Sequence, residues 1–395
     1  MHTKIFLLLL FVKFLIGAES KIVGLVPVRN EALMIAPCLK ALAMYADAIV
    51  VLDDASDDNT VDVVKALQQE CRIEKIITKE KWYRDEPGDR NLLLQAGRAI
   101  GGTHFVVIDA DEMFTANLLK NNLLRTKILA LQPGEALNVT WINLWRSTAY
   151  YRYDYSVWSG QDVNVAFCDD DKCFYQPDNS QAGFIHTSRS PSNLKGKVHT
   201  LVLDDQSFDF LNTCLKDYGY PILRFNNDNI NYDHNNLHLQ RYLKDCLLNR
   251  KQTLTTAVVD LKVPVTMDLK QIFWINGSSL KSCYRHDFTA GLMHFQFVNW
   301  NNLLAKQAWY RCLEKIRNQQ INVESINKMY GESKKEEDLR LVSCPKAWFV
   351  GYDFFDRKVY EQGNSWQKKQ IVEWFTQYGK EFFADLDIWD VNWDV

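Results

Sequence analysis

The chain has little of what marks several common protein classes. Its 46 Lys and Arg nearly balance 49 Asp and Glu, for a net charge of −3, so no global field draws it to nucleic acid. Its nine cysteines are scattered, and the nearest pair, Cys168 and Cys173, lacks the CxxC spacing of zinc or thioredoxin-like motifs. An odd count also argues against a complete disulfide framework. We therefore expect buried free thiols and no nucleic-acid partner.

The first 20 residues resemble a secretory signal peptide. A basic start and an apolar stretch precede the small residues Gly17 and Ala18. Lys13 interrupts the stretch, which is shorter than the roughly 20 residues of a membrane-spanning helix. An uncleaved anchor that associates with a membrane is the alternative. A signal predicts an exported, secretory-lumen or membrane-associated protein, and without one the protein is expected in the cytoplasm.

From Lys21 to Phe114, short β-branched runs alternate with helical patterns. This alternation is typical of βαβ units on a parallel sheet that is buried on both faces. The expected strands are 22–28, 48–52, 74–78 and 104–108, and the expected helices are 31–45, 61–70 and 90–100. Further strands are expected at 137–145 and 163–175. Polar clusters follow the strand ends, where open α/β sheets bind their ligands.

Beyond about residue 235 the pattern becomes mainly helical. The expected helices are 238–256, 303–319, 323–329 and 367–383. Asn and Asp crowd between 226 and 236 without periodicity, which indicates a boundary. We predict a catalytic α/β domain at 21–230 and a mainly helical acceptor-side or accessory region at 231–395. The stretch from Trp300 to Trp309, with Lys306 and Gln307, either lines a groove or packs its aromatics on the core.

Asp109-Ala-Asp111, followed by Glu112, comes directly after the strongest predicted strand. Two carboxylates two residues apart at a strand end can jointly hold Mg²⁺ or Mn²⁺, which bridges the phosphates of a donor. Such a metal offsets the charge on a departing diphosphate. A DxD triplet alone is a common chance pattern, and then only a solvated turn. Its place after a buried strand favours the metal site.

A second acidic cluster, Asp53 and Asp54, ends the second predicted strand. The loop that follows includes Ser56, Asp57 and Asp58, any of which can cap the next helix. Carboxylates at this position can also accept hydrogen bonds from a ribose or a base edge. Both interpretations stay open at the level of the residues.

Four blocks of the sequence together resemble family 2 glycosyltransferases with the GT-A fold. The blocks are 26–31, 50–60, 88–91 and 106–112, in the order and spacing of that family. The resemblance covers Lys21 to about Phe114 well, continues loosely to about Pro191 and says little about the last half. It implies a GT-A, Rossmann-like, mostly parallel sheet flanked by helices, with a mainly helical C-terminal extension.

The resemblance also implies roles for individual residues. It places at the donor nucleotide Pro27, Arg29, Glu31, Asp53, Asp54, Arg90 and Asp109. The chemistry of Arg90 agrees, because a planar cation suits diphosphate oxygens. An ordinary salt bridge at the start of a helix is the simpler alternative for that residue.

For the metal, Mn²⁺ or Mg²⁺, the resemblance implies Asp111 as the main ligand with Asp109 assisting. Enzymes of this fold often add a histidine from beyond the DxD, and His186 and His294 are the candidates. A lone histidine is more often structural, so both assignments are alternatives to a packing role.

An inverting transferase also needs a carboxylate base that deprotonates the acceptor hydroxyl. The candidates are Asp162, Asp169 to Asp171, Asp204 and Asp205. No motif selects among them, and each can equally be a surface carboxylate. The catalytic base is therefore left unassigned.

These features predict a metal-dependent, inverting glycosyltransferase. Its donor is a UDP-, GDP- or dTDP-linked sugar, and its acceptor is a hydroxyl of a glycan, lipid or protein. A nucleotidyltransferase would carry a Gly- and Lys/Arg-rich loop after the first strand, where this chain has Arg29-Asn-Glu-Ala32. The other alternative is a non-catalytic carbohydrate-binding or surface protein on a degenerate GT-A fold. A degenerate copy is expected to have lost an acid or Arg90, and this chain retains them.

Overall fold

The computed structural model describes most of the chain outside two long segments. The described residues are 20–83, 85–119, 122–152, 158, 161–177, 187–200, 224–226, 229–231, 273–276, 279–282, 290–336, 339, 341–358 and 366–393. The predicted signal peptide, His186, Asp204, Asp205 and the helix expected at 238–256 lie outside these residues. The structure therefore does not test what the sequence predicts for these segments.

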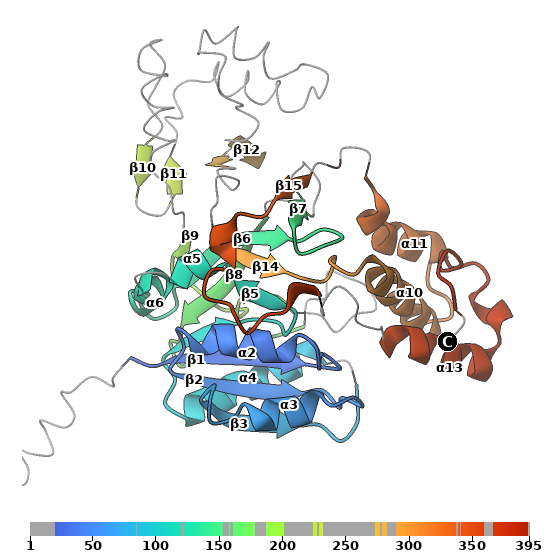
Figure 1. Ribbon diagram of the computed structural model, residues 1–395, viewed down its shortest axis with the longest axis horizontal. Coiled ribbons are helices and arrows are strands. Elements are labelled where there is room, and N and C mark those ends of the chain that lie inside the picture. Colours follow the sequence, from blue (N-terminus) through green and yellow to red (C-terminus); the bar gives the residue numbers. More distant parts are fainter. Residues whose placement is uncertain are drawn as a thin grey trace, which may run out of the picture.

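The N-terminal quarter alternates parallel strands with helices, as predicted (Figure 1). The elements are β1 (Ile22–Val28), α2 (Ile35–Ala43), β2 (Ala48–Asp53), α3 (Thr60–Ala66), β3 (Ile73–Thr78), α4 (Glu86–Ala99) and β4 (His104–Val107). Successive side chains of a strand point to opposite faces of the sheet. Ile49 and Val51 pack with α2 and α3, whereas Val50 and Leu52 pack with α4. Both faces are covered, which explains why these strands are continuous apolar runs.

The second half of the sheet mixes strand directions. Its strands are β5 (Glu112–Phe114), β6 (Ala136–Asn143), β8 (Gln161–Cys168), β9 (Val198–Thr200) and β14 (Leu292–His294). The order across the sheet is β3-β2-β1-β4-β8-β6-β14-β5, and β9 pairs with β6. β8 is antiparallel to both β4 and β6, and β14 is antiparallel to β5 but parallel to β6. The mostly parallel α/β fold is confirmed, and the sheet takes one strand from beyond residue 230.

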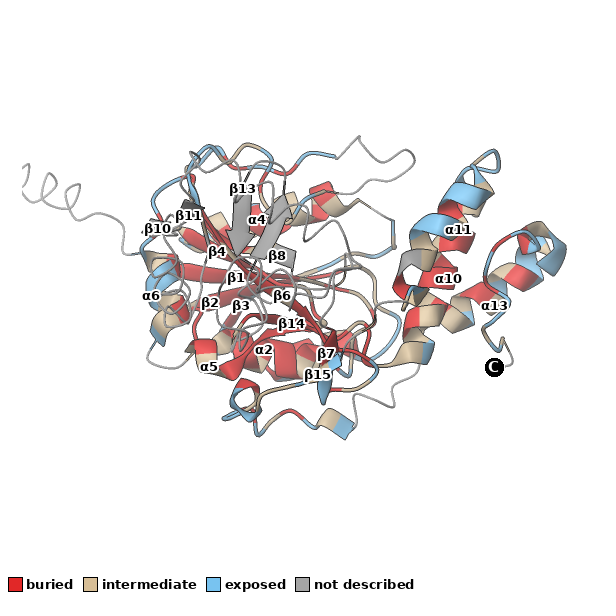
Figure 2. Ribbon diagram, turned by 90° about the horizontal axis from the view of Figure 1, so that it is seen from above, coloured by how far each residue is buried: buried red, intermediate tan, exposed pale blue. Residues whose placement is uncertain are grey.

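The C-terminal helices form a separate lobe beside the sheet (Figures 1 and 2). The lobe consists of α10 (Trp300–Arg317), α11 (Val323–Gly331), α13 (Trp366–Tyr378) and the 3-10 turn η6 (Lys380–Phe383). Buried residues of α10 and α13, such as Trp309, Ile371 and Phe375, make its own small core. Trp82, from the loop after β3, packs against this core and joins the lobe to the sheet.

Shorter elements complete the described structure. They are α5 (Ala116–Leu119), α6 (Leu123–Leu129), β7 (Tyr150–Arg152), β10 (Arg224–Asn226), β11 (Asn229–Asn231), β12 (Phe273–Asn276), β13 (Ser279–Ser282), η4 (Glu332–Lys334), β15 (Leu341–Ser343) and η5 (Lys346–Trp348). β7 pairs with β15, and a third apolar core, which includes Met293 and Trp348, lies near them. The described cysteines are free thiols, and all but Cys344 are buried, as predicted.

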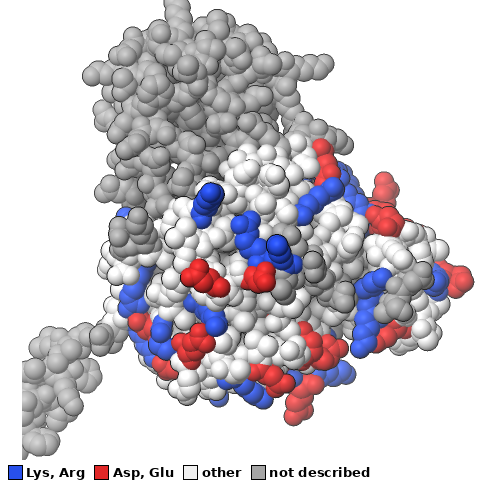
Figure 3. Space-filling view, in the orientation of Figure 1, with Lys and Arg blue, Asp and Glu red and all other residues white. Residues whose placement is uncertain are grey.

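The surface carries no extended area of one charge on the face seen in Figure 3, where acidic and basic side chains are interspersed. This distribution agrees with the nearly balanced composition. Within the described residues, no helix combines the length and the apolar character needed to cross a membrane.

Strand register brings the predicted polar clusters to one edge of the sheet. Val28 pairs with Asp53, and Leu25 pairs with Val107, two residues before Asp109. The parallel strands β1, β2 and β4 therefore end together. At the opposite edge, the backbone N–H of Asp169 donates to Thr103 O at the start of β4. With a rise of about 3.3 Å per strand residue, Asp169 lies roughly 15–20 Å from Asp109.

Gly97 allows α4 to lie close against the sheet. A Cβ at this position would come within 2.5 Å of Phe105 Cε1. We expect Gly97→Val to lower the free energy of unfolding by about 1–3 kcal/mol through overpacking. Gln95→Val, on the exposed side of the same helix, is the matched control for helix propensity and should cost under about 1 kcal/mol. Equal losses in urea denaturation would show that close packing at Gly97 is unimportant.

Candidate active site

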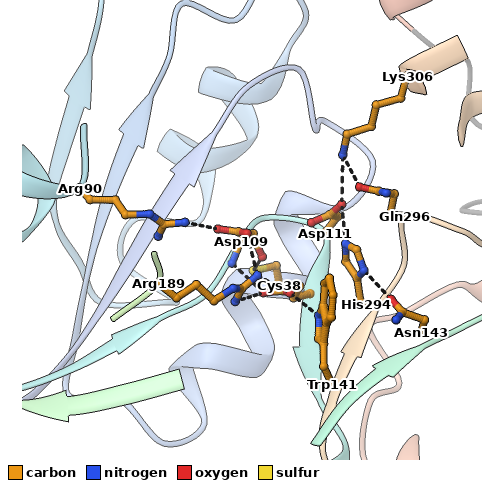
Figure 4. Close-up of polar contacts among 11 residues, drawn as sticks. Cys38, Arg90, Asp109, Asp111, Trp141, Asn143, Arg189, His294, Gln296 and Lys306 are labelled. Carbon is orange, nitrogen blue, oxygen red and sulfur yellow. Dashed lines mark hydrogen bonds and ion pairs between the residues drawn. The ribbon is translucent and has the colours of Figure 1, made fainter. Parts of the chain in front are cut away.

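The turn that carries the DxD triplet is held by a buried carboxylate, that of Glu112. Glu112 has no exposed surface, and both of its oxygens accept hydrogen bonds. Trp141 Nε1 donates to Oε1 at 2.9 Å, and the backbone N–H of Asp109 donates to Oε2 at 3.0 Å. Glu112 is therefore occupied in shaping the turn, which leaves the carboxylates of Asp109 and Asp111 as the candidates for ligand binding (Figure 4).

Arg189 neutralises this turn. Its guanidinium donates to both oxygens of Glu112 at 2.7 and 2.6 Å, and to Asp109 Oδ2 at 2.7 Å. Such planar two-pronged contacts are the strongest kind of ion pair in proteins. Burial by itself would lower the pKa of Arg189, but the charges of Asp109 and Glu112 raise it above its ordinary value. Arg189 lies three residues after the candidate ligand His186 and belongs to no motif, so no signal in the sequence indicated it.

Cross-strand pairing brings His294 to Asp111. β14 pairs with β5 so that His294 lies opposite Glu112, next to Asp111, and Phe295 N donates to Asp111 O at 3.0 Å. His294 Nε2 lies 3.6 Å from Asp111 Oδ2. Burial alone would raise the pKa of Asp111, but its interactions with His294 and Lys306 lower the pKa well below the ordinary value. The structure thus brings Asp111 and His294 together, and their role as metal ligands stays a prediction.

Hydrogen bonds select which nitrogen of His294 faces Asp111. The Nδ2 of Asn143 donates to the carbonyl oxygen of Trp158 at 2.7 Å, so its Oδ1 faces His294. That oxygen accepts from His294 Nδ1 at 2.8 Å, which places a proton on Nδ1. The ring also stacks on Trp141, with centroids 4.6 Å apart. Nε2 is consequently held toward Asp111, the arrangement that supports a metal-binding histidine.

Lys306, on α10, approaches Asp111 from the C-terminal lobe. Its Nζ lies 3.8 Å from Asp111 Oδ2 and donates to Gln296 Oε1 at 2.8 Å. Burial would lower the pKa of Lys306, but the charge of Asp111 raises it, so the side chain is a cation. Residues 300–309 were expected either to line a groove or to pack on the core, and α10 does both. Lys306 faces the site, while Gln307 and Trp309 are buried.

Arg90 and Asp109 form the other side of the site. Arg90 lies in the first turns of α4, and its Nη2 is 3.5 Å from Asp109 Oδ1. Its Nη1 is buried and has no hydrogen-bond partner in the described part of the chain. Figure 4 shows Arg90 and Lys306 on opposite sides of the DxD carboxylates. Arg90 therefore takes part in a long salt bridge and also retains donor capacity for an anion.

The two acids at the end of β2 have different surroundings. Asp53 is 2% exposed, and its Oδ2 accepts from the backbone N–H of Ser56, so it shapes the loop. Asp54 lies closer to the surface and pairs with Lys79 at 2.6 Å. Burial raises the pKa of Asp54, and Lys79 opposes that rise. Both acids stay candidates for a base or ribose contact, and Asp54 is the more exposed of the two.

Arg29 joins this edge to the C-terminal lobe. Its Nη1 donates to the carbonyl oxygens of Asp54 and Ala55. Its Cζ lies 5.1 Å from the ring centroids of both Trp82 and Trp366. Arg29 is thus held by the protein itself, and a direct contact with the nucleotide stays a prediction.

A cleft opens beside Asp111, between the sheet and the C-terminal lobe. Its lining comes from the segment after β1, the loop before α3, the DxD turn, the loop after β14 and residues of α10 and α13. Glu31 is part of this lining, whereas Pro27 lies within β1 and pairs with Leu52. Burial raises the pKa of Glu31 to about 8, and the neighbouring charge of Asp111 adds to the rise.

The structure separates the candidate catalytic bases. Asp169 to Asp171 follow β8 at the opposite edge of the sheet, where Arg98 binds Asp169 in a two-pronged ion pair. The prediction that one of them is the catalytic base is wrong, because they lie too far from the DxD turn. A potential metal cluster there, formed by Asp169, Asp170 and Cys173, lies just as far from the DxD turn. The backbone of Asp162 pairs with Thr140, next to Trp141, which keeps Asp162 at the correct edge.

The sequence of this region matches a known family. Residues 25–125 match the model of "Glycosyl transferase family 2", nearly the same residues that carry the resemblance in the four blocks. The match covers about a quarter of the chain, the part that ends shortly after the DxD turn, and it makes this segment similar to glycosyltransferases. A search of curated proteins finds no match.

Several solved glycosyltransferase structures are similar to the chain at low identity. TarS 1–349 of S. aureus in complex with UDP-GlcNAc is 13% identical, covering 61% of this chain and 80% of that chain, with a TM-score of 0.31. The mannosyltransferase PcManGT from Pyrobaculum calidifontis, in complex with GDP-Man and Mn²⁺, is 23% identical over 32% and 36%, with a TM-score of 0.25. Glucosyl-3-phosphoglycerate synthase from Mycobacterium tuberculosis, in complex with Mg²⁺ and UDP, is 19% identical over 32% and 44%, with a TM-score of 0.21. Because these scores are low, the assignments below rest on the geometry of this chain.

The Arg189 ion pair makes a testable contribution to stability. Arg189→Ala would leave the charge of Glu112 buried with two neutral donors, and we expect a loss of about 3–5 kcal/mol in the free energy of unfolding. The double variant Arg189→Ala/Glu112→Gln should recover part of that loss, because it also removes the unpaired charge. Chemical denaturation of the parent, both single variants and the double variant measures the coupling. Strictly additive losses would show that the two side chains do not interact.

Proposed function

We propose that the chain transfers a sugar, with inversion, from a nucleoside-diphosphate sugar to an acceptor hydroxyl. In this reaction the acceptor oxygen bonds to the anomeric carbon while the bond from that carbon to the diphosphate oxygen breaks. The hydroxyl proton passes to a carboxylate base, and the nucleoside diphosphate leaves. The observation that carries the proposal is the Asn143–His294–Asp111 arrangement beside Asp109 and Arg90 at the strand ends.

The residues around Asp111 fit a divalent cation. A carboxylate oxygen and an imidazole nitrogen are suitable ligands for Mn²⁺ and acceptable to Mg²⁺ when waters complete the shell. Adjacent ligands at bonds of about 2.1 Å lie roughly 3 Å apart, close to the 3.6 Å between His294 Nε2 and Asp111 Oδ2. Asp109 is already paired with Arg189 and Arg90, so Asp111 and His294 are the better ligands. When bound there, the cation supplies charge neutralisation for the departing diphosphate.

The other residues bind and orient the donor. Asp54 accepts hydrogen bonds from the base or ribose at the end of β2. Arg90 uses its unpartnered Nη1 to hold phosphate oxygens, to which a planar guanidinium is matched. Lys306 offers a second cation on the far side of Asp111. Asp162 is retained as the candidate base, and the N-terminal residues are proposed to direct the enzyme to a secretory or membrane-associated location.

The role of Asp111 can be tested by a change that keeps its shape. Asp111→Asn should weaken Mn²⁺-dependent binding of UDP, GDP or dTDP by at least about 100-fold, since a direct ligand matters more than a supporting residue. Transfer of sugar should fall with it. Calorimetric titration with and without Mn²⁺ gives the affinities, and Asp170→Asn, at the opposite edge of the sheet, is the matched control. Unchanged Mn²⁺ dependence in Asp111→Asn would contradict the metal assignment.

The role of Asn143 is to orient His294. Removing it in Asn143→Ala frees the imidazole to rotate or to change tautomer, so metal affinity should fall about 10- to 100-fold. Asn138→Ala, on the same strand, is the control and should leave the affinity as in the parent. If both variants bind Mn²⁺ with the parent's affinity, Asn143 does not orient a metal ligand.

A further inference from the structure

The cleft beside Asp111 has the lining of a carbohydrate site. Five of its side chains are amides, and they come from different segments of the chain: Asn30, Gln296, Asn299, Asn302 and Gln367. An amide both donates and accepts hydrogen bonds, as does each hydroxyl of a sugar. Amides gathered in one concavity therefore match a ring that carries several hydroxyl groups.

The charges of the lining argue against a free anion as the occupant. Two carboxylates, those of Asp58 and Asp111, and the acid Glu31 line the cleft together with one cation, Lys306. An anionic group without a bound cation would be repelled there, whereas a neutral polyol can donate hydrogen bonds to the carboxylates. Asp111 is part of the lining of this cleft, and Figure 4 shows Arg90 on the other side of the DxD carboxylates. A ligand with one end in the cleft can therefore place its phosphates on the side of Asp111 where Arg90 lies.

An aromatic ring and an unpaired amide complete the lining. Trp366 is held in place by Arg29, at 5.1 Å, and by Trp309, with ring centroids 5.3 Å apart, and a fixed indole can pack on the apolar face of a sugar ring. Asn30 is 8% exposed and has a left-handed backbone, with φ 53°. Its Oδ1 accepts from Asp57 N, but its Nδ2 is buried without a partner among the described residues. Leaving such a donor unpaired is costly, and a ligand hydroxyl would satisfy it.

We infer that this cleft binds a pyranose ring, next to the atom at which transfer takes place. The inference rests on the proposed function and extends it, because it makes the C-terminal helices α10 and α13 part of the sugar site. The ring belongs either to the donor or to the acceptor, since both offer the same pattern of hydroxyl groups. Trp366 packs on the ring, and Asn302 and Gln367 bind its hydroxyls.

Two adjacent asparagines on α10 give a matched experiment. Asn302 lines the cleft, whereas Asn301 is exposed and does not. Asn302→Ala is compared with Asn301→Ala, and Trp366→Leu with Trp374→Leu, which lies on α13 outside the cleft. Each full-length variant is titrated with UDP and GDP, and with UDP-glucose, UDP-N-acetylglucosamine and GDP-mannose, all with Mn²⁺. Transfer to p-nitrophenyl glycosides then gives the KM of the acceptor.

If the donor sugar occupies the cleft, the two cleft variants should bind the nucleotide sugar about 5- to 10-fold more weakly and bind the free nucleotide as the parent does. If the acceptor occupies it, both donor affinities stay unchanged and the KM of the acceptor rises by a similar factor. The control variants should match the parent in every measurement.

Equal losses for the free nucleotide and the nucleotide sugar would place the nucleotide in the cleft and overturn the inference. Cleft variants that match the parent in all assays would overturn it as well, while leaving the proposed function intact. A parent chain that binds none of the nucleotides would overturn the proposed function and this inference with it. Loss of folding in Trp366→Leu is recognised by circular dichroism, and Asn302→Ala then carries the test.

Discussion

Glu112 is a carboxylate with no exposed surface, and each contact of its two oxygens ties another part of the chain to the DxD turn. The backbone of Asp109 shapes the turn itself, Trp141 attaches it to β6, and Arg189 brings in the loop before β9. A buried charge is tolerated only when it is paired and fully hydrogen-bonded. Because all these partners are needed at once, the turn has one arrangement, and Asp109 and Asp111 are presented at the strand end.

Side chains that make more than one contact also position the groups that face Asp111. Trp141 donates to Glu112 and also stacks on His294, so one side chain links the shape of the turn to the orientation of the imidazole. Asn143, two residues further along β6, selects the tautomer. Lys306 arrives from a helix of the C-terminal lobe, which the Arg29, Trp82 and Trp366 contacts hold against the sheet. The lobe therefore contributes a side chain to the site and is held in a fixed position beside it.

Much of the first 115 residues was predictable from sequence, because local pattern and fold agree there. The runs at β1, β2 and β4 are buried on both faces, and each ends in the polar cluster that the pattern indicated. Boundaries were less accurate: α4 begins at Glu86, four residues before the expected start, because Asp85 caps it by accepting from Gly88 N. Arg189 and Asn143 were missed, since neither lies in a motif and each acts through a partner distant in the sequence.

By itself, the sequence determined the alternation of strands and helices, the acids at the strand ends and the similarity of residues 25–125 to family 2 glycosyltransferases. All of these depend on residues close together along the chain. Only the tertiary structure decided that β14 inserts between β6 and β5, because strand pairing joins segments about 150 residues apart, which no local pattern encodes. That pairing places His294 beside Asp111, while the packing of the C-terminal lobe adds Lys306 and the amide-lined cleft. Asp169 to Asp171 were separated from the site for the same reason, since strand direction alone sends them to the opposite edge.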